Sequence, residues 1–161
     1  MKRRPQALLN RLLPKEKLNQ YQGNPTAKNI LAPLTIITIA RSLIHIFAPD
    51  GGVQSIATIP LNSFTPNGTA TVILIFALWG LSQLLIGLIY VTVLWRYQAL
   101  ILLMYLLMII EYGVRIVLGY LKPIETIGTA PGGIGNFVIL PLAIIMLILS
   151  LREQDILTPS T

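Results

Sequence analysis

Five side chains that can ionise or form strong hydrogen bonds interrupt the apolar stretches of this 161-residue chain: Arg41, His45, Gln83, Glu111 and Arg115. Arg41 and His45 are four residues apart, so they share one face of a helix. Glu111 and Arg115 have the same spacing. A carboxylate beside a guanidinium forms an ion pair, and an imidazole transfers protons or binds metals. The chemistry to consider is therefore ion pairing, proton transfer or the binding of a charged ligand.

The segments that carry these residues are too apolar for a soluble domain. The chain is 54% hydrophobic and 11% charged, with a mean hydropathy of +0.73, whereas soluble domains carry about 25% charged residues. A membrane-spanning helix needs about 20 mostly apolar residues. Four segments meet that requirement, at about 30–48, 70–95, 98–121 and 134–151. The predicted fold is an all-α bundle of four transmembrane helices.

The predicted bundle occupies residues 29–152 and is flanked by two tails. Residues 1–28 form a basic tail that lies in the cytoplasm or at the membrane interface, and residues 153–161 form a cytoplasmic tail. Leucines recur at helical spacing within residues 5–18, which predicts a short amphipathic helix in the headgroup layer. A disordered basic tail is the alternative interpretation.

Lysine and arginine are distributed unevenly among the connecting segments. Seven of them precede the first span, Arg96 lies between the second and third spans, and Arg152 follows the fourth. Only Lys122 falls on the other side. The positive-inside rule therefore predicts a multi-pass protein of the inner cell membrane with both termini in the cytoplasm. Because the basic tail adjoins apolar segments, we expect it to contact membrane lipids and not nucleic acid.

The five polar residues fall at similar depth in the predicted bundle, from its middle into its outer half, when residues are counted at about 1.5 Å each. A charge at the membrane centre costs about 2.5–3.5 kcal/mol even on the mildest scale, so such side chains should face one another. We expect Glu111 to pair with Arg115 along its own helix and with Arg41 across to the first helix.

Two further features adjoin these residues. Gln83 is flanked by Gly80 and Gly87, which predicts close approach of a neighbouring backbone. Tyr105 and Tyr112 lie one heptad apart and could add hydroxyl groups, although aromatic packing is the simpler interpretation. The predicted ligand-binding residues are Arg41, His45, Gln83, Glu111, Tyr112 and Arg115.

The charge count leaves two interpretations of this group. Two arginines against one glutamate leave one positive charge, and an unpaired buried charge needs a partner. Asp50 or Glu125 of the outer loops would supply it if the group is purely structural. Otherwise an anionic or strongly polar ligand would enter from the outer leaflet, such as a lipid, a quinone or a small anion. No metal and no cofactor are predicted apart from a possible quinone or lipid. The absence of cysteine excludes thiolate zinc sites and iron–sulfur clusters, and one histidine excludes a haem held by two histidines of the chain.

The function classes that remain concern binding and assembly. We expect no enzyme, because the sequence has no nucleophile–base pair, metal cluster or phosphate loop. A transporter ranks lowest, since four helices make a narrow bundle without visible inverted repeats. The alternative to a ligand-binding bundle is an accessory subunit of a larger membrane complex, such as a redox or photosynthetic one. Its partners would be other membrane subunits or a second copy of the chain.

Three short motifs resemble those of DoxX-like proteins, which are small four-helix bacterial membrane proteins. They are Ala40-Arg41, the stretch from Trp79-Gly80 to Gly87, and Glu111-Tyr112-Gly113-x-Arg115 with Gly119. The resemblance covers most of residues 35–150 and implies the four-helix fold and a loose association with quinone-linked or redox membrane complexes. DoxX-like proteins usually carry an acidic residue in the second helix, where this chain has Gln83, so the resemblance implies the fold and not a shared function.

Overall fold

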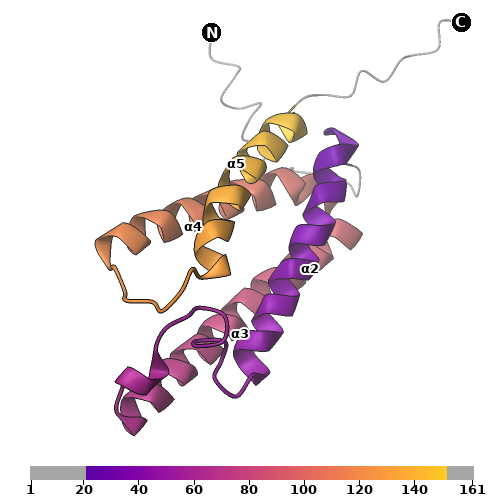
Figure 1. Ribbon diagram of the computed structural model, residues 1–161. Helices are drawn as coiled ribbons and strands as arrows, with labels where there is room; N and C mark the ends of the chain where they lie inside the picture. Colours follow the sequence, from indigo (N-terminus) through magenta and orange to yellow (C-terminus); the bar gives the residue numbers. More distant parts are fainter. Residues whose placement is uncertain (1–20, 152–161) are drawn as a thin grey trace, which may run out of the picture.

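The structure is a computed structural model that describes residues 21–151. Its elements are α2 (Pro25–Phe47), η1 (Leu61–Ser63), α3 (Pro66–Arg96), η2 (Gln98–Leu100), α4 (Ile101–Leu121) and α5 (Pro131–Leu151) (Figure 1). Within the described range every regular element is helical and there is no strand. The amphipathic helix predicted at residues 5–18 lies outside the described residues.

The four long helices have the length and composition of membrane spans. Including η2 with α4, they contain 23, 31, 24 and 21 residues, and each carries a strongly apolar window. Many of their large apolar side chains point outward; Leu74, Leu85 and Val117, for example, are each more than half exposed. Lipid is the solvent in which such a surface is stable. The prediction of an all-α chain with four such helices is confirmed, and this architecture is compatible with a multi-pass membrane protein.

Three of the helices begin at a proline, a few residues earlier than the apolar runs suggest. Pro25, Pro66 and Pro131 each occupy the first helical position, where the missing N–H of proline costs nothing. Asn24 and Thr65 cap the first two of these helices by accepting hydrogen bonds from first-turn amides. The first turns of these three helices are polar, so a prediction from hydropathy alone places the start of each span too late.

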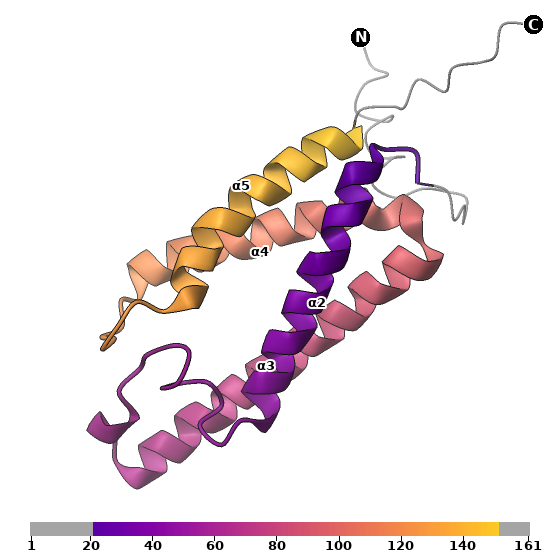
Figure 2. The same ribbon diagram turned by 45° about the vertical axis from the view of Figure 1, so that its right-hand side comes forward.

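The helices are arranged as two pairs. α2 packs closely along α3, and α4 packs along α5, whereas α3 and α4 contact each other only sparsely. Figure 2 shows α3 and α4 diverging from the turn at Tyr97 that connects them. We call the end of the molecule at this turn the hairpin end, and the end with the α2–α3 and α4–α5 connections the loop end.

Glycines explain the close α2–α3 packing. A Cβ atom placed on Gly80 would lie 2.7 Å from the Cβ of His45 and 3.0 Å from the carbonyl oxygen of Ser42. One placed on Gly87 would lie 2.8 Å from Cγ1 of Ile39. The close backbone approach predicted from the glycines beside Gln83 is therefore confirmed, and the neighbour is α2.

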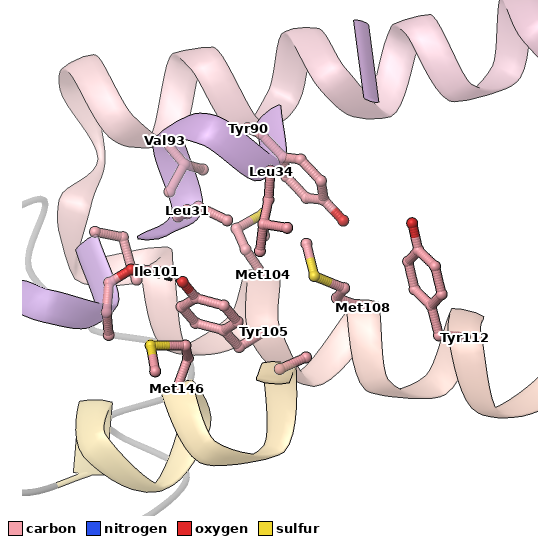
Figure 3. Close-up of a cluster of buried hydrophobic side chains, with 12 residues drawn as sticks. Leu31, Leu34, Tyr90, Val93, Ile101, Met104, Tyr105, Met108, Tyr112 and Met146 are labelled. Atoms are coloured by element: carbon pink, nitrogen blue, oxygen red, sulfur yellow. Dashed lines mark hydrogen bonds between the residues drawn. The ribbon is translucent and has the colours of Figure 1, made fainter. Parts of the chain in front are cut away.

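The apolar core fills the hairpin half of the molecule, where all four helices meet (Figure 3). Leu31, Ile101 and Tyr105 are fully buried in it. The Tyr105 hydroxyl donates a 2.6 Å hydrogen bond to the carbonyl oxygen of Ala27, so this tyrosine joins α4 to α2 within the core. Tyr105 therefore has a packing role, which agrees with the simpler of the two interpretations of its sequence position.

Polar contacts reinforce the hairpin end. The hydroxyls of Tyr21 and Ser150 are hydrogen-bonded at 2.6 Å, which joins the residues before α2 to the end of α5. Burial raises the pKa of the Tyr21 hydroxyl, and the bond to Ser150 offsets part of that rise. Lys28 Nζ donates a 3.0 Å hydrogen bond to Gln98 Oε1. The two helix pairs are thus firmly joined at this end.

At the loop end, the α2–α3 connection folds back onto the helices, where Gly51 lies close to Phe76 and Gly52 lies close to His45. Val53 is fully buried. The Asp50 carboxylate accepts hydrogen bonds from the backbone amides of Gly52, Gln54 and Ser55 at 2.7–3.1 Å. Burial acts to raise the pKa of this carboxyl, but these hydrogen bonds together lower it below its usual value. Asp50 is therefore committed to shaping its own loop.

Candidate functional site

A chain of hydrogen bonds across three helices joins four of the predicted polar residues. Arg41 Nη2 of α2 donates to Gln83 Oε1 of α3 at 3.1 Å. Gln83 Nε2 donates to Glu111 Oε1 of α4 at 2.9 Å. The same Glu111 oxygen accepts from Arg115 Nη2 one turn further along α4. We call Arg41, Gln83, Glu111 and Arg115 the polar cluster.

The hydrogen bonds of the polar cluster confirm one of the two predicted pairings of Glu111 and contradict the other. The ion pair of Glu111 with Arg115 is confirmed. The direct pairing of Glu111 with Arg41 is wrong, because the Gln83 amide lies between them and bonds to both. The two charged residues sit on helices of different pairs, and the separation of those pairs leaves room for an intervening side chain.

Trp79 is a member of this site that the sequence reasoning missed. The guanidinium carbon of Arg41 lies 5.4 Å from the centroid of the Trp79 ring, and that of Arg115 lies 4.9 Å from it. Both distances are within the range of cation–π attraction. Trp79 directly precedes Gly80 and lies four residues before Gln83, on the same helix face, which is the signal that could have identified it.

His45 lies beside Trp79 and connects the site to the α2–α3 loop. Its ring centroid is 4.8 Å from that of Trp79 and 5.6 Å from that of Phe76. Its Nδ1–H donates a 2.7 Å hydrogen bond to the carbonyl oxygen of Gly51, because only the protonated nitrogen can bond to a carbonyl. Among residues 21–151 no group of three metal-ligating side chains occurs, so nothing described here completes a metal site around His45.

Tyr112 borders the polar cluster on the side of the apolar core. It is buried, and its ring centroid lies 5.2 Å from the guanidinium carbon of Arg115. Figure 3 shows the side chains of Tyr90 and Tyr112 projecting from α3 and α4 into the space between these helices. Tyr90 was not among the predicted site residues, since nothing in its sequence surroundings separates it from ordinary core aromatics.

The other buried polar groups beside the site are satisfied within α2. The hydroxyls of Thr35, Thr38 and Ser42 each donate to the carbonyl oxygen four residues earlier, at 2.6–2.9 Å. Such bonds leave no hydroxyl unpaired in an apolar surrounding. The hydroxyls of these residues therefore bond within α2 and not to the polar cluster.

Arg41 is the residue whose bonding is incomplete. Its Nε–H is buried and has no hydrogen-bond partner among the described residues. Its Nη2 bonds to a neutral amide, while the carboxylate of Glu111 is paired with Arg115. Asp50, one of the expected partners, is engaged with the backbone of its own loop. Within the part of the chain that the structure describes, the Glu111–Arg115 pair is the only ion pair.

Chemically, this arrangement offers hydrogen-bond donors and one positive charge that no described carboxylate balances. A guanidinium in such a surrounding binds oxyanions and carbonyl oxygens well, because its planar donors match their geometry. No protein-family model, curated protein or solved structure matches the chain. The resemblance to DoxX-like proteins therefore remains a prediction.

Proposed function

We propose that this chain is a multi-pass membrane protein whose polar cluster binds an anionic or strongly polar ligand. The observation that carries the proposal is the buried Nε–H of Arg41, which has no acceptor, on a side chain without a carboxylate partner among the described residues. A ligand oxygen would supply the missing acceptor, and an anionic ligand would also supply the missing negative charge. A lipid headgroup, a quinone and a small anion share this oxygen chemistry.

The proposed setting is the inner cell membrane with both termini in the cytoplasm, as the distribution of basic residues predicts. In that orientation the loop end faces outward, and the ligand comes from the outer leaflet. The role proposed for the site is binding and not catalysis. Arg41 and Gln83 would contact the ligand, Trp79 would flank it, and Glu111 would hold Arg115 in place.

The two tryptophans of the chain provide a direct test. A Trp95→Phe variant leaves Trp79 as the only tryptophan, so its emission reports on the site itself. The variant would be placed in phosphatidylcholine nanodiscs and titrated separately with phosphatidylglycerol carrying brominated acyl chains, with decylubiquinone and with inorganic phosphate. We expect one of these probes to change the Trp79 emission in a saturable manner.

Arg41→Gln in the same background should weaken that response about tenfold or more, because a charge-assisted bond is worth about 1.5–3 kcal/mol. Arg96→Gln is the matched control, since it removes an arginine at the hairpin end of α3. The proposal is wrong if none of the three probes gives a saturable response that depends on Arg41. The probe that does respond identifies the source of the ligand oxygen.

A second candidate is an accessory subunit of a larger membrane complex, with a purely structural polar cluster. The observation that favours it is the free space beside Gly113 and, at a separate position on α4, beside Gly119, where an added Cβ atom would meet nothing within 4 Å. Small residues on a membrane helix allow a partner helix to approach closely. Gly113→Leu should then abolish co-purification of a partner while the chain still folds, and purification as a stable, partner-free monomer would argue against this role.

A further inference from the structure

One residue joins the two helix pairs at the loop end. The amide of Ile127 donates a 2.9 Å hydrogen bond to the carbonyl oxygen of Thr58. The Thr58 hydroxyl donates a second bond, also 2.9 Å, to the carbonyl oxygen of Gly128. Among the described residues these are the only hydrogen bonds between the α2–α3 loop and the α4–α5 loop. We call them the Thr58 clasp.

The clasp is held in an unfavourable backbone conformation. Thr58 has a φ of 56° and is the only described residue other than glycine with a positive φ. A β-branched residue in this region is a steric outlier, which persists only while surrounding contacts enforce it. Those contacts include the two bonds to residues 127 and 128. Their release would let Thr58 relax, so the closed state holds strain that favours opening.

The loop that carries Thr58 is also continuous with the polar site. Gly51, in the same loop, accepts the hydrogen bond from His45 Nδ1. The His45 ring packs on Trp79, and Trp79 packs on both arginines of the polar cluster. A movement of this loop therefore has a path of direct contacts to Arg41.

We propose that the Thr58 clasp controls access of ligand to Arg41, an inference that rests on the proposed binding function. With the clasp closed, the loop ends of the two helix pairs are held together on the loop-end side of the polar cluster. With the clasp open, the pairs separate further at the loop end, where α3 and α4 are already apart (Figure 2). The hairpin end stays closed, because the apolar core and the Tyr105 bond hold it.

The chain permits a clean crosslinking test because it has no cysteine. A Cβ atom placed on Gly128 would lie 3.9 Å from the Cβ of Thr58, and a disulfide requires about 3.5–4.5 Å. Thr58→Cys with Gly128→Cys, in the Trp95→Phe background, should therefore form a disulfide. The probe is whichever of brominated phosphatidylglycerol, decylubiquinone and inorganic phosphate gives the Arg41-dependent response at Trp79. Oxidation should slow association of that probe by about tenfold or more, and reduction should restore it. An unchanged rate in protein shown by mass spectrometry to be crosslinked would overturn the proposal.

A second measurement needs no ligand and does not depend on the disulfide. Spin labels at Asn62 and Ile124, both exposed, report the distance between the two loops. Thr58→Ala should shift the distance distribution towards longer values. The matched control is Thr71→Ala, since the Thr71 hydroxyl bonds only within α3. Identical distance distributions in Thr58→Ala and Thr71→Ala would overturn the proposed role of the clasp. A distribution that shifts in Thr58→Ala, together with the absence of any Arg41-dependent probe response, would overturn the binding function alone.

Discussion

Gln83 donates a 2.9 Å hydrogen bond from Nε2 to Glu111 Oε1, and this bond joins α3 to α4 where the two helices have little other contact. It also fixes the orientation of the amide. Because Nε2 faces Glu111, Oε1 faces Arg41 and accepts from it at 3.1 Å. Neither a carboxylate nor an apolar side chain at position 83 could donate to one neighbour and accept from the other.

Gln83→Leu should therefore destabilise the fold while preserving side-chain size. It leaves Arg41 without its acceptor and Glu111 with one donor fewer, and each unsatisfied buried group costs about 1–3 kcal/mol. The measurement is the free energy of unfolding in detergent micelles. Ser82→Ala, on the exposed side of α3, is the control and should change it by about 0.5 kcal/mol or less. Equal stability of the two variants would show that the amide does not join the helices.

The glycines of α3 and α4 should respond in opposite ways to alanine. In Gly80→Ala the new Cβ would meet the Ser42 carbonyl oxygen and the His45 Cβ, neither of which is the free end of a side chain. Such overpacking costs about 1–3 kcal/mol. In Gly113→Ala the new methyl group meets open space, so the higher helix propensity of alanine should leave stability unchanged or raise it by up to about 1 kcal/mol.

Thermal unfolding in micelles would compare the two glycine variants directly. A Gly80→Ala protein as stable as Gly113→Ala would mean that α2 and α3 are further apart than the structure places them. A loss of stability in Gly113→Ala would mean that the surface of α4 at this position packs inside the molecule. A loss of association with unchanged stability would instead mean that this surface contacts a partner.

The sequence predicted those parts of the site that depend on local spacing. The four-residue interval between Glu111 and Arg115 is enough to predict their ion pair, because a helix brings such residues together whatever surrounds it. The role of Gly80 followed in the same way from its position one turn before Gln83. The number of long helices followed from hydropathy, whereas the starts of α2, α3 and α5 did not.

Contacts between helices could not be predicted because they depend on the rotation and divergence of each helix. The separation of α3 from α4 places Gln83 between Glu111 and Arg41, and no local pattern encodes that separation. Asp50 was one of two possible partners for the unpaired positive charge, but the turns at Gly51 and Gly52, with φ of 60° and 70°, bring backbone amides to its carboxylate instead.

The Asp50 loop should lose stability in acid. Hydrogen bonds from its own loop keep the folded pKa of Asp50 below the ordinary value of 3.8, despite burial. A carboxyl with a lowered folded pKa stabilises the fold above its unfolded pKa, and this contribution is lost as the pH falls through the folded value. Wild type should therefore exceed Asp50→Asn in stability by about 1 kcal/mol at pH 6, and the difference should shrink as the pH falls below the ordinary carboxyl pKa of 3.8.

Unfolding midpoints measured from pH 6 down to the acid limit would test this. Glu125→Gln is the matched change at an exposed carboxylate of the other loop and should leave the pH profile of wild type intact. A constant gap between wild type and Asp50→Asn across this range would contradict the assignment of the carboxylate to the loop amides.

Ionisation of Tyr21 should lower the stability of the fold in alkali. Its pKa is raised above the ordinary value of 10.0, because burial outweighs the hydrogen bond to Ser150. For a group whose folded pKa is raised, the stabilisation is complete below the unfolded pKa and is lost as the pH rises through the folded one. Tyr21→Phe cannot ionise, so it should lose less stability than wild type above about pH 10. At neutral pH it should be less stable by about 0.5–1.5 kcal/mol, the net value of one hydrogen bond.

A double-mutant cycle separates the hydrogen bond from the titration. Ser150→Ala should reproduce the neutral-pH loss of Tyr21→Phe, and the double variant should lose little more, because both remove the same 2.6 Å contact. Tyr120→Phe, at an exposed tyrosine, should match wild type throughout. If the two losses simply add, the residues before α2 are not joined to the end of α5 by this bond.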